Sequence, residues 1–89
     1  MNRNIPEYIK DIFVKTIHYE KSQCIFKYRH KQKLFSVEFP GTLYTFEWFS
    51  IKQMLALTGY KVMYRYNTVY IYDVDDFELL HGVLKLHVS

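Results

Sequence analysis

The chain has 89 residues, a formal net charge of +3, nine Tyr and seven Phe. This length leaves room for one domain and excludes a second hydrophobic core. The single cysteine, Cys24, excludes an internal disulfide and favours a reducing compartment. The first residues do not resemble a secretory signal, and no apolar run approaches the roughly 20 residues of a membrane span. We therefore expect a cytoplasmic protein, in the host cytoplasm if the gene is viral, without membrane insertion.

Apolar residues recur at helical spacing near the start of the chain. Asn4 is a suitable N-cap, and the pattern predicts a short helix that ends near Ile12 or Phe13. Residues 14–20 then alternate between apolar and polar side chains, which predicts a strand. A tight turn at residues 21–22 would fold this strand against the next one.

The most regular pattern lies in residues 23–39, which predict a β-hairpin folded around residues 30–33. Arg29 then faces Leu34. Because side chains alternate across a strand, one face is apolar and comprises Cys24, Phe26, Tyr28, Phe35, Val37 and Phe39. The other face is polar and comprises Ile25, Lys27, Arg29, Leu34, Ser36 and Glu38. A slip of one residue would bury the basic side chains, so the register is well specified.

With the strand at residues 14–20, this hairpin would form a three-stranded antiparallel meander. A helix is then predicted from Thr45 to about Thr58, with Gly59 as its stop. The helix is apolar on two sides. One stripe comprises Trp48, Ile51, Met54 and Leu55, and the other comprises Phe46, Phe49 and Leu57. We expect both stripes to be buried between layers, the alternative being a partner that covers one of them.

Residues 60–73 predict a second hairpin, with Asn67 and Thr68 as its two-residue turn because Asn tolerates a positive φ. Tyr66 then faces Val69. The side of this hairpin away from the core comprises Met63, Arg65, Tyr70 and Tyr72.

Asp75 is the predicted N-cap of a last helix, with Glu78 completing a capping box. This helix would end near His81. Residues 83–88 alternate and favour a final strand over further helix. The sum is an α+β single domain over residues 1–89, in which two or three helices cover one face of an antiparallel sheet. The other face would be at least partly open to solvent.

Cations gather at the tip of the first hairpin, within seven residues: Lys27, Arg29, His30, Lys31 and Lys33. Arg65, Tyr70 and Tyr72 are predicted on the same outer face. Cations attract phosphates, and exposed tyrosines stack unpaired bases. The pattern predicts a non-enzymatic protein that binds RNA or single-stranded nucleic acid, against the simpler interpretation of a solvated hairpin tip.

The exposed aromatic and thioether side chains support an alternative hypothesis. Met63, Tyr70, Tyr72 and Phe49 are of types enriched in protein interfaces. They suit a protein-binding regulator, such as a phage-type inhibitor of a host enzyme. Its partner would be an acidic protein surface or a second copy of this chain.

Metal and cofactor chemistry is not predicted. The four histidines, at positions 18, 30, 81 and 87, lack zinc-motif spacing, and the acidic residues at 73–76 suit a helix N-terminus. No nucleophile carries a recognisable local motif, so an enzyme is the less favoured interpretation.

One segment resembles a known family. Residues 59–66, followed by the strand at residues 69–72, resemble the central hairpin of RelE-type toxins, small basic ribonucleases that cut messenger RNA on the ribosome. The paired N-terminal helices of that family are not apparent in this sequence. The resemblance implies a ribonuclease in which Arg65 stabilises phosphate charge.

Overall fold

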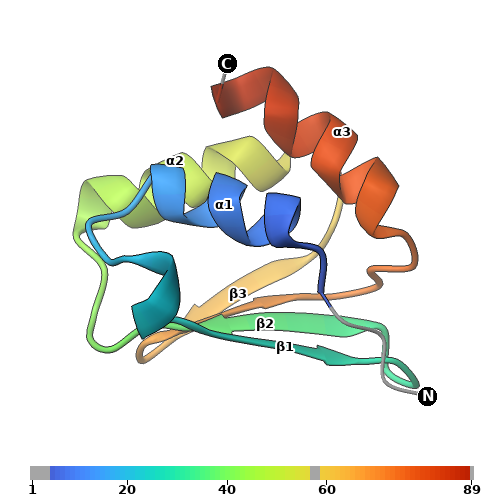
Figure 1. The fold of residues 1–89 in the computed structure, drawn as a ribbon, viewed down its shortest axis with the longest axis horizontal. Helices are drawn as coiled ribbons and strands as arrows, with labels where there is room; N and C mark the ends of the chain where they lie inside the picture. Colours follow the sequence, from blue (N-terminus) through green and yellow to red (C-terminus); the bar gives the residue numbers. More distant parts are fainter. Residues whose placement is uncertain (1–4, 57–58, 89) are drawn as a thin grey trace.

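The computed structural model describes residues 5–56 and 59–88, and of residues 83–88 only the course of the helix. The elements in chain order are α1 (Glu7–Lys15), the short 3-10 helix η1 (Lys21–Gln23), β1 (Ile25–Arg29), β2 (Leu34–Glu38), α2 (Thr45–Ala56), β3 (Val62–Arg65), β4 (Thr68–Ile71) and α3 (Phe77–Val88). Four strands form one antiparallel sheet, and the three α-helices lie on one side of it (Figure 1). The α+β fold class is confirmed.

The first hairpin has the register that alternation predicts. Arg29 pairs with Leu34 and Phe26 pairs with Val37. Phe35 and Val37 are fully buried under the helices, whereas Lys27 on the opposite face is exposed. Burial of one face therefore fixes this register, as the period of two requires.

The segment at residues 14–20 is not a strand, so the predicted three-stranded meander is wrong. Helix α1 continues to Lys15, and a loop and η1 follow it. Ile17 and Tyr19 alternate because they pack on the core from this loop, not because they pair with β1. Asn4, the expected cap, lies outside the described residues, and Pro6 is the residue that precedes the first turn of α1.

Without that strand, the sheet is completed by the second hairpin. Its order is β1-β2-β4-β3, and β4 pairs antiparallel with β2, bringing Val69 opposite Val37. This arrangement leaves β1 and β3 as the two edge strands. All four strands share a helix-covered inner face and an outer face that none of the described helices covers.

The turn of the second hairpin differs from the prediction by one position. Arg65 pairs with Thr68, so the turn is Tyr66 and Asn67, and Tyr66 rather than Asn67 adopts the positive φ, at 58°. Asn67 is held elsewhere: its Nδ2 donates to the carbonyl of Phe39 at 2.7 Å, and its own carbonyl accepts from the amide of Phe39. Each residue of this hairpin therefore pairs with a residue two positions away from the one predicted. A shift of two leaves the side chains on the faces that were predicted for them. Tyr66 is the exception, because it is 80% exposed instead of facing the core.

Helix α2 begins at Thr45 as predicted, and one of its two apolar stripes is in the core. Ile51 and Leu55 are fully buried, and Trp48 stacks on Tyr64 with ring centroids 4.9 Å apart. The expected burial of the second stripe is wrong. Phe46 is 68% exposed and Phe49 is 57% exposed, because no described element packs beyond α2. Leu57, the third residue of that stripe, and the predicted helix end at Thr58 lie outside the described residues.

The last element is helix throughout, so the predicted final strand at residues 83–88 is wrong. Its N-cap is also one residue later than predicted: the amide of Glu78 donates to Oδ1 of Asp76 at 2.8 Å, while Asp75 forms an ion pair with Lys33. Apolar side chains of a helix recur often enough that a short stretch also alternates, which explains the error.

Candidate nucleic-acid interface

The outer face of the sheet is an ordered grid of side chains from all four strands. Strand pairing aligns two complete rows across it. The first comprises Lys27, Ser36, Tyr70 and Met63, and the second comprises Ile25, Glu38, Thr68 and Arg65. The amide of Tyr72 donates to the carbonyl of Lys61 at 2.9 Å, so the pairing of β3 with β4 extends one position further. Lys61 and Tyr72 therefore lie side by side at the end of the sheet that holds Arg29.

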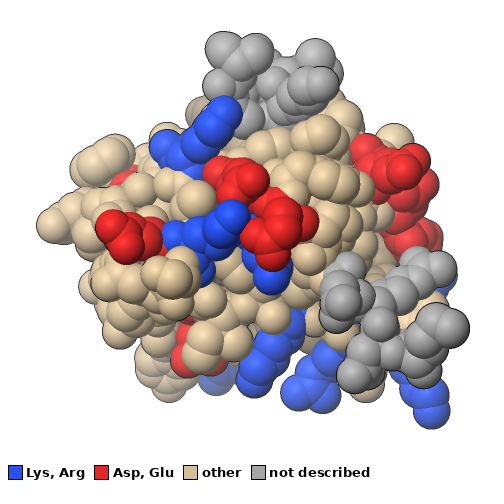
Figure 2. All heavy atoms as spheres, viewed as in Figure 1, with Lys and Arg blue, Asp and Glu red and all other residues tan. Residues whose placement is uncertain are grey.

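Cations occupy both edges of this grid, and tyrosines occupy its middle. Lys27 and Arg29 lie on edge strand β1, and Arg65 and the adjoining Lys61 lie on edge strand β3; all four are exposed. In the two aligned rows, Glu38 is the single carboxylate. Figure 2 shows blue spheres gathered along the lower border, beneath the sheet, whereas red and blue lie together over the helices. We call Lys27, Arg29, Lys61 and Arg65 the outer-face cations.

The outer-face cations differ from several cations elsewhere in the structure. Lys10 lies 3.2 Å from Glu7, and Lys21 lies 2.7 Å from Asp11. In residues 5–56 and 59–82, none of the outer-face cations forms an ion pair with a carboxylate. Their charge is therefore available to an external anion without first breaking an internal pair.

At the tip of the first hairpin, Lys33 has different surroundings from the other residues of the predicted basic cluster. Lys33 has a φ of 52°, and its Nζ lies 2.7 Å from Oδ1 of Asp75. This hydrogen bond raises the pKa of Lys33. The carbonyl of Lys33 also accepts from the amide of Val74. Lys33 thus joins the tip to the loop before α3, while His30 and Lys31 remain exposed.

The aromatic groups of the outer face have different surroundings. Tyr70 and Tyr72 are both half-buried, and Nζ of Lys61 lies 5.7 Å from the centroid of the Tyr72 ring. The guanidinium of Arg65 lies 5.9 Å from the ring of Tyr66 in the adjoining turn. Lys61 was not predicted to lie on this face. It is two residues from Met63, so the alternation of side chains along a strand could have placed it there.

The residues of the alternative protein interface do not share one layer. Met63, Tyr70 and Tyr72 belong to the outer face, whereas Phe49 belongs to α2 in the helix layer (Figure 1). A single flat partner could not cover both sides of the sheet. Three exposed aromatic side chains lie close together in sequence around the start of α2: Tyr44, Phe46 and Phe49.

A second polar constellation lies on the helix side and was not predicted. Glu47 is 1% exposed, and its carboxylate accepts hydrogen bonds from the backbone amides of Tyr44 and His18. Nδ1 of His18 lies 2.9 Å from the same carboxylate. Burial raises the pKa of the Glu47 carboxyl, but the hydrogen bonds from Tyr44 and His18 outweigh burial and hold the pKa below its ordinary value.

This constellation has a structural explanation. The ionised carboxylate of Glu47 only accepts hydrogen bonds, so Nδ1 of His18 donates. The His18 ring also packs on Tyr19 and Tyr44, with centroids 4.0 and 4.6 Å away. Glu47 therefore caps the start of α2 and ties it to the loop after α1, a function of the N3 position in a capping box. The sequence signal was weak because Tyr44, not Ser or Thr, precedes the helix.

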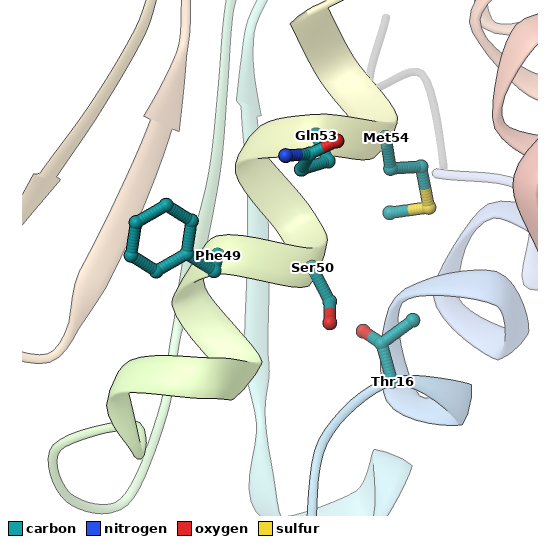
Figure 3. Close-up of a pocket in the computed structure, with 5 residues that line it drawn as sticks. All are labelled: Thr16, Phe49, Ser50, Gln53 and Met54. Atoms are coloured by element: carbon teal, nitrogen blue, oxygen red, sulfur yellow. The ribbon is translucent and has the colours of Figure 1, made fainter.

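A hollow of about 350 Å³ lies between α2 and the end of α1, lined by Thr16, Phe49, Ser50, Gln53 and Met54. Figure 3 shows the hydroxyls of Thr16 and Ser50 turned toward each other. Both hydroxyls donate to backbone carbonyls within their own segments, and no lining residue titrates near neutral pH. The hollow therefore offers two hydroxyls but, among its lining residues, no acid or base that could activate them.

In the part of the chain that the structure describes, no three His, Cys, Asp or Glu side chains gather as a metal site, and no helix could cross a bilayer. Cys24 is buried in the core, as predicted, and burial raises the pKa of its thiol.

Comparison with models of protein families, with characterised proteins and with solved structures finds no match. The resemblance to RelE-type toxins, and a catalytic role for Arg65, stay predictions.

Proposed function

We propose that this chain is a small, non-enzymatic nucleic-acid-binding protein, acting on RNA or single-stranded DNA through the outer face of its sheet. The observation that carries the proposal is the position of the four outer-face cations. They flank Tyr70 and Tyr72 on both sides, and none of them is paired with a described carboxylate. Cations supply affinity for phosphates, and aromatic rings supply stacking for bases.

The number of outer-face cations predicts how steeply the binding constant should depend on salt concentration. If each outer-face cation neutralises one phosphate, the logarithm of the binding constant for a single strand should fall with the logarithm of salt concentration with a slope of about −3. His30 and Lys31 at the tip would add at most about −1.4 to that slope. Lys33 is expected to add little, because Asp75 already holds its ammonium group.

The first experiment is a mobility-shift titration with mixed pools of RNA and single-stranded DNA at low salt. The proposal predicts a shifted band that weakens steeply as salt rises. Repeating the titration at four or more salt concentrations gives the slope. The absence of any shift at low salt would remove the proposal.

A second candidate function is protein binding through α2, and the exposure of Phe46 and Phe49 favours it. Large exposed aromatics are enriched in interfaces and are costly to leave in water. A pull-down after nuclease treatment tests it, because nucleic acid can no longer bridge the two proteins. Under this candidate, Phe46→Ser with Phe49→Ser abolishes capture of the partner, whereas reversal of the outer-face charges does not.

A further inference from the structure

The spacing of Tyr70 and Tyr72 constrains what the outer face can hold. The two residues are two positions apart along β4 and its extension, so their side chains project from the same face. A strand rises about 3.4 Å per residue, which places the two attachment points about 6.8 Å apart. Both residues are half-buried, so part of their surface is open to solvent.

This spacing does not match stacked nucleic acid. Neighbouring bases in one strand of a duplex are about 3.4 Å apart along the helix axis, half of the tyrosine spacing. Two neighbouring bases can occupy both rings only when they are pulled apart from each other. Bases are free to separate in this way in single strands, where no complementary strand holds them.

The neighbours of the two tyrosine rings fit a single strand of nucleic acid that lies along β4. Ser36 is the neighbour of Tyr70 on β2, and Met63 is its neighbour on β3. Adjacent strands are about 4.8 Å apart, so the backbone of a nucleic acid lying over the tyrosines passes within reach of the long side chains of Lys61 and Arg65. Lys27 and Arg29 are two strands away, on the other side.

We propose that Tyr70 and Tyr72 form a two-base platform that binds neighbouring unstacked bases, so that the protein selects single-stranded over double-stranded nucleic acid. This inference rests on the proposed function and adds the conformation of the ligand. Tyr70 takes the first base, because Lys61 lies over the ring of Tyr72 in the free protein. A phosphate of the incoming strand draws the exposed Lys61 ammonium away and opens the second ring.

The test compares binding of three probes by fluorescence anisotropy at one salt concentration. The probes are oligouridylate and oligothymidylate of about 12 nucleotides, a length within the range of known single-strand sites, and a blunt RNA duplex of equal length. The inference predicts that at least one single strand binds about tenfold or more tightly than the duplex. Equal affinities would overturn the inference, while salt-dependent binding to all probes would leave the proposed function standing. Binding to none of them would remove both.

Variants at the two tyrosines separate stacking from charge. Tyr70→Leu and Tyr72→Leu should each lower single-strand affinity by about 5- to 150-fold, the equivalent of one lost stack, and leave duplex affinity unchanged. Tyr70→Phe keeps the ring and should keep the affinity. Tyr8→Leu, in α1, is a control on the helix side. A Tyr70→Leu variant that melts at the wild-type temperature and binds oligouridylate as well as Tyr70→Phe does would overturn the platform.

Discussion

The inner and outer faces of the same four strands differ in what determines their residues. Phe35, Val37, Val69 and Ile71 on the inner face are all fully buried beneath the helices. The outer face has exposed cations at its edges and half-buried tyrosines in its middle. Folding requires an apolar inner face, but it requires of the outer face only that it tolerate water. The outer-face cations, which pair with no described carboxylate, are therefore not required by the fold, and the proposed function is one account of them.

The largest effect is expected on the inner face. Phe35→Ala removes a fully buried ring that meets Phe13 edge to face, with centroids 5.6 Å apart. The loss of burial and the resulting cavity should lower the free energy of unfolding by about 3–5 kcal/mol. Urea denaturation measures it. A loss below about 1 kcal/mol would mean that this face is not the core of the fold.

Glu47 is an exception to the apolar interior, because its charged side chain is buried on the helix side of the sheet. Glu47→Gln keeps the shape of the side chain but replaces one accepting oxygen with an NH2 group, which cannot accept from the backbone amide of Tyr44 or His18. The expected loss is about 1.5–3 kcal/mol of unfolding free energy, typical of hydrogen bonds to a charged group. A stability equal to that of the wild type would show that the carboxylate does not fasten α2 to the loop.

The same carboxylate predicts a pH dependence of stability. Because its pKa is lower in the folded protein than the ordinary value of 4.5, the unfolded chain binds its proton first as pH falls. The stabilisation is therefore complete above pH 4.5 and is lost as pH falls through the folded pKa. Denaturation at a series of acidic pH values should show a smaller loss in Glu47→Gln than in the wild type. Identical acid profiles would contradict the assignment.

The smallest effect is expected at Lys33, where the basic tip meets Asp75. Lys33→Ala should change affinity for single-stranded RNA much less than Lys27→Ala does, because its charge is already paired in the free protein. Both variants remove one positive charge, so they control for each other. An equal loss of affinity in the two would mean that the ion pair with Asp75 opens on binding.

The sequence predicted those parts of the fold that depend on burial of one strand face or one helix face. The first hairpin register and the buried stripe of α2 are of this kind. The loop that carries Ile17 and Tyr19 was mistaken for a strand, because a loop packed on a core can also alternate. Asn67 was placed in the wrong turn position because its contact with Phe39, just after β2, joins residues far apart in the sequence.

The candidate interface was predictable in its parts but not in its arrangement. The alternation of side chains along each strand was enough to predict Lys27, Arg29, Arg65 and Tyr70 on the outer face. Their common grid depends on the pairing of β2 with β4, which joins segments far apart in the sequence. The ion pair of Lys33 and Asp75 has the same origin, and for that reason the tip appeared more available to a ligand than it is.

Charge reversal with a matched control tests the central claim most directly. Lys27→Glu with Arg29→Glu changes the outer face, and Lys15→Glu with Lys52→Glu makes the same change in net charge on exposed residues of α1 and α2. The salt dependence of oligouridylate binding is measured for both variants. The outer-face variant should lose about tenfold or more in affinity and about 1.4 of the salt slope, while the helix-side variant stays close to the wild type. Equal losses in the two variants would mean that net charge, and not this face, attracts the nucleic acid.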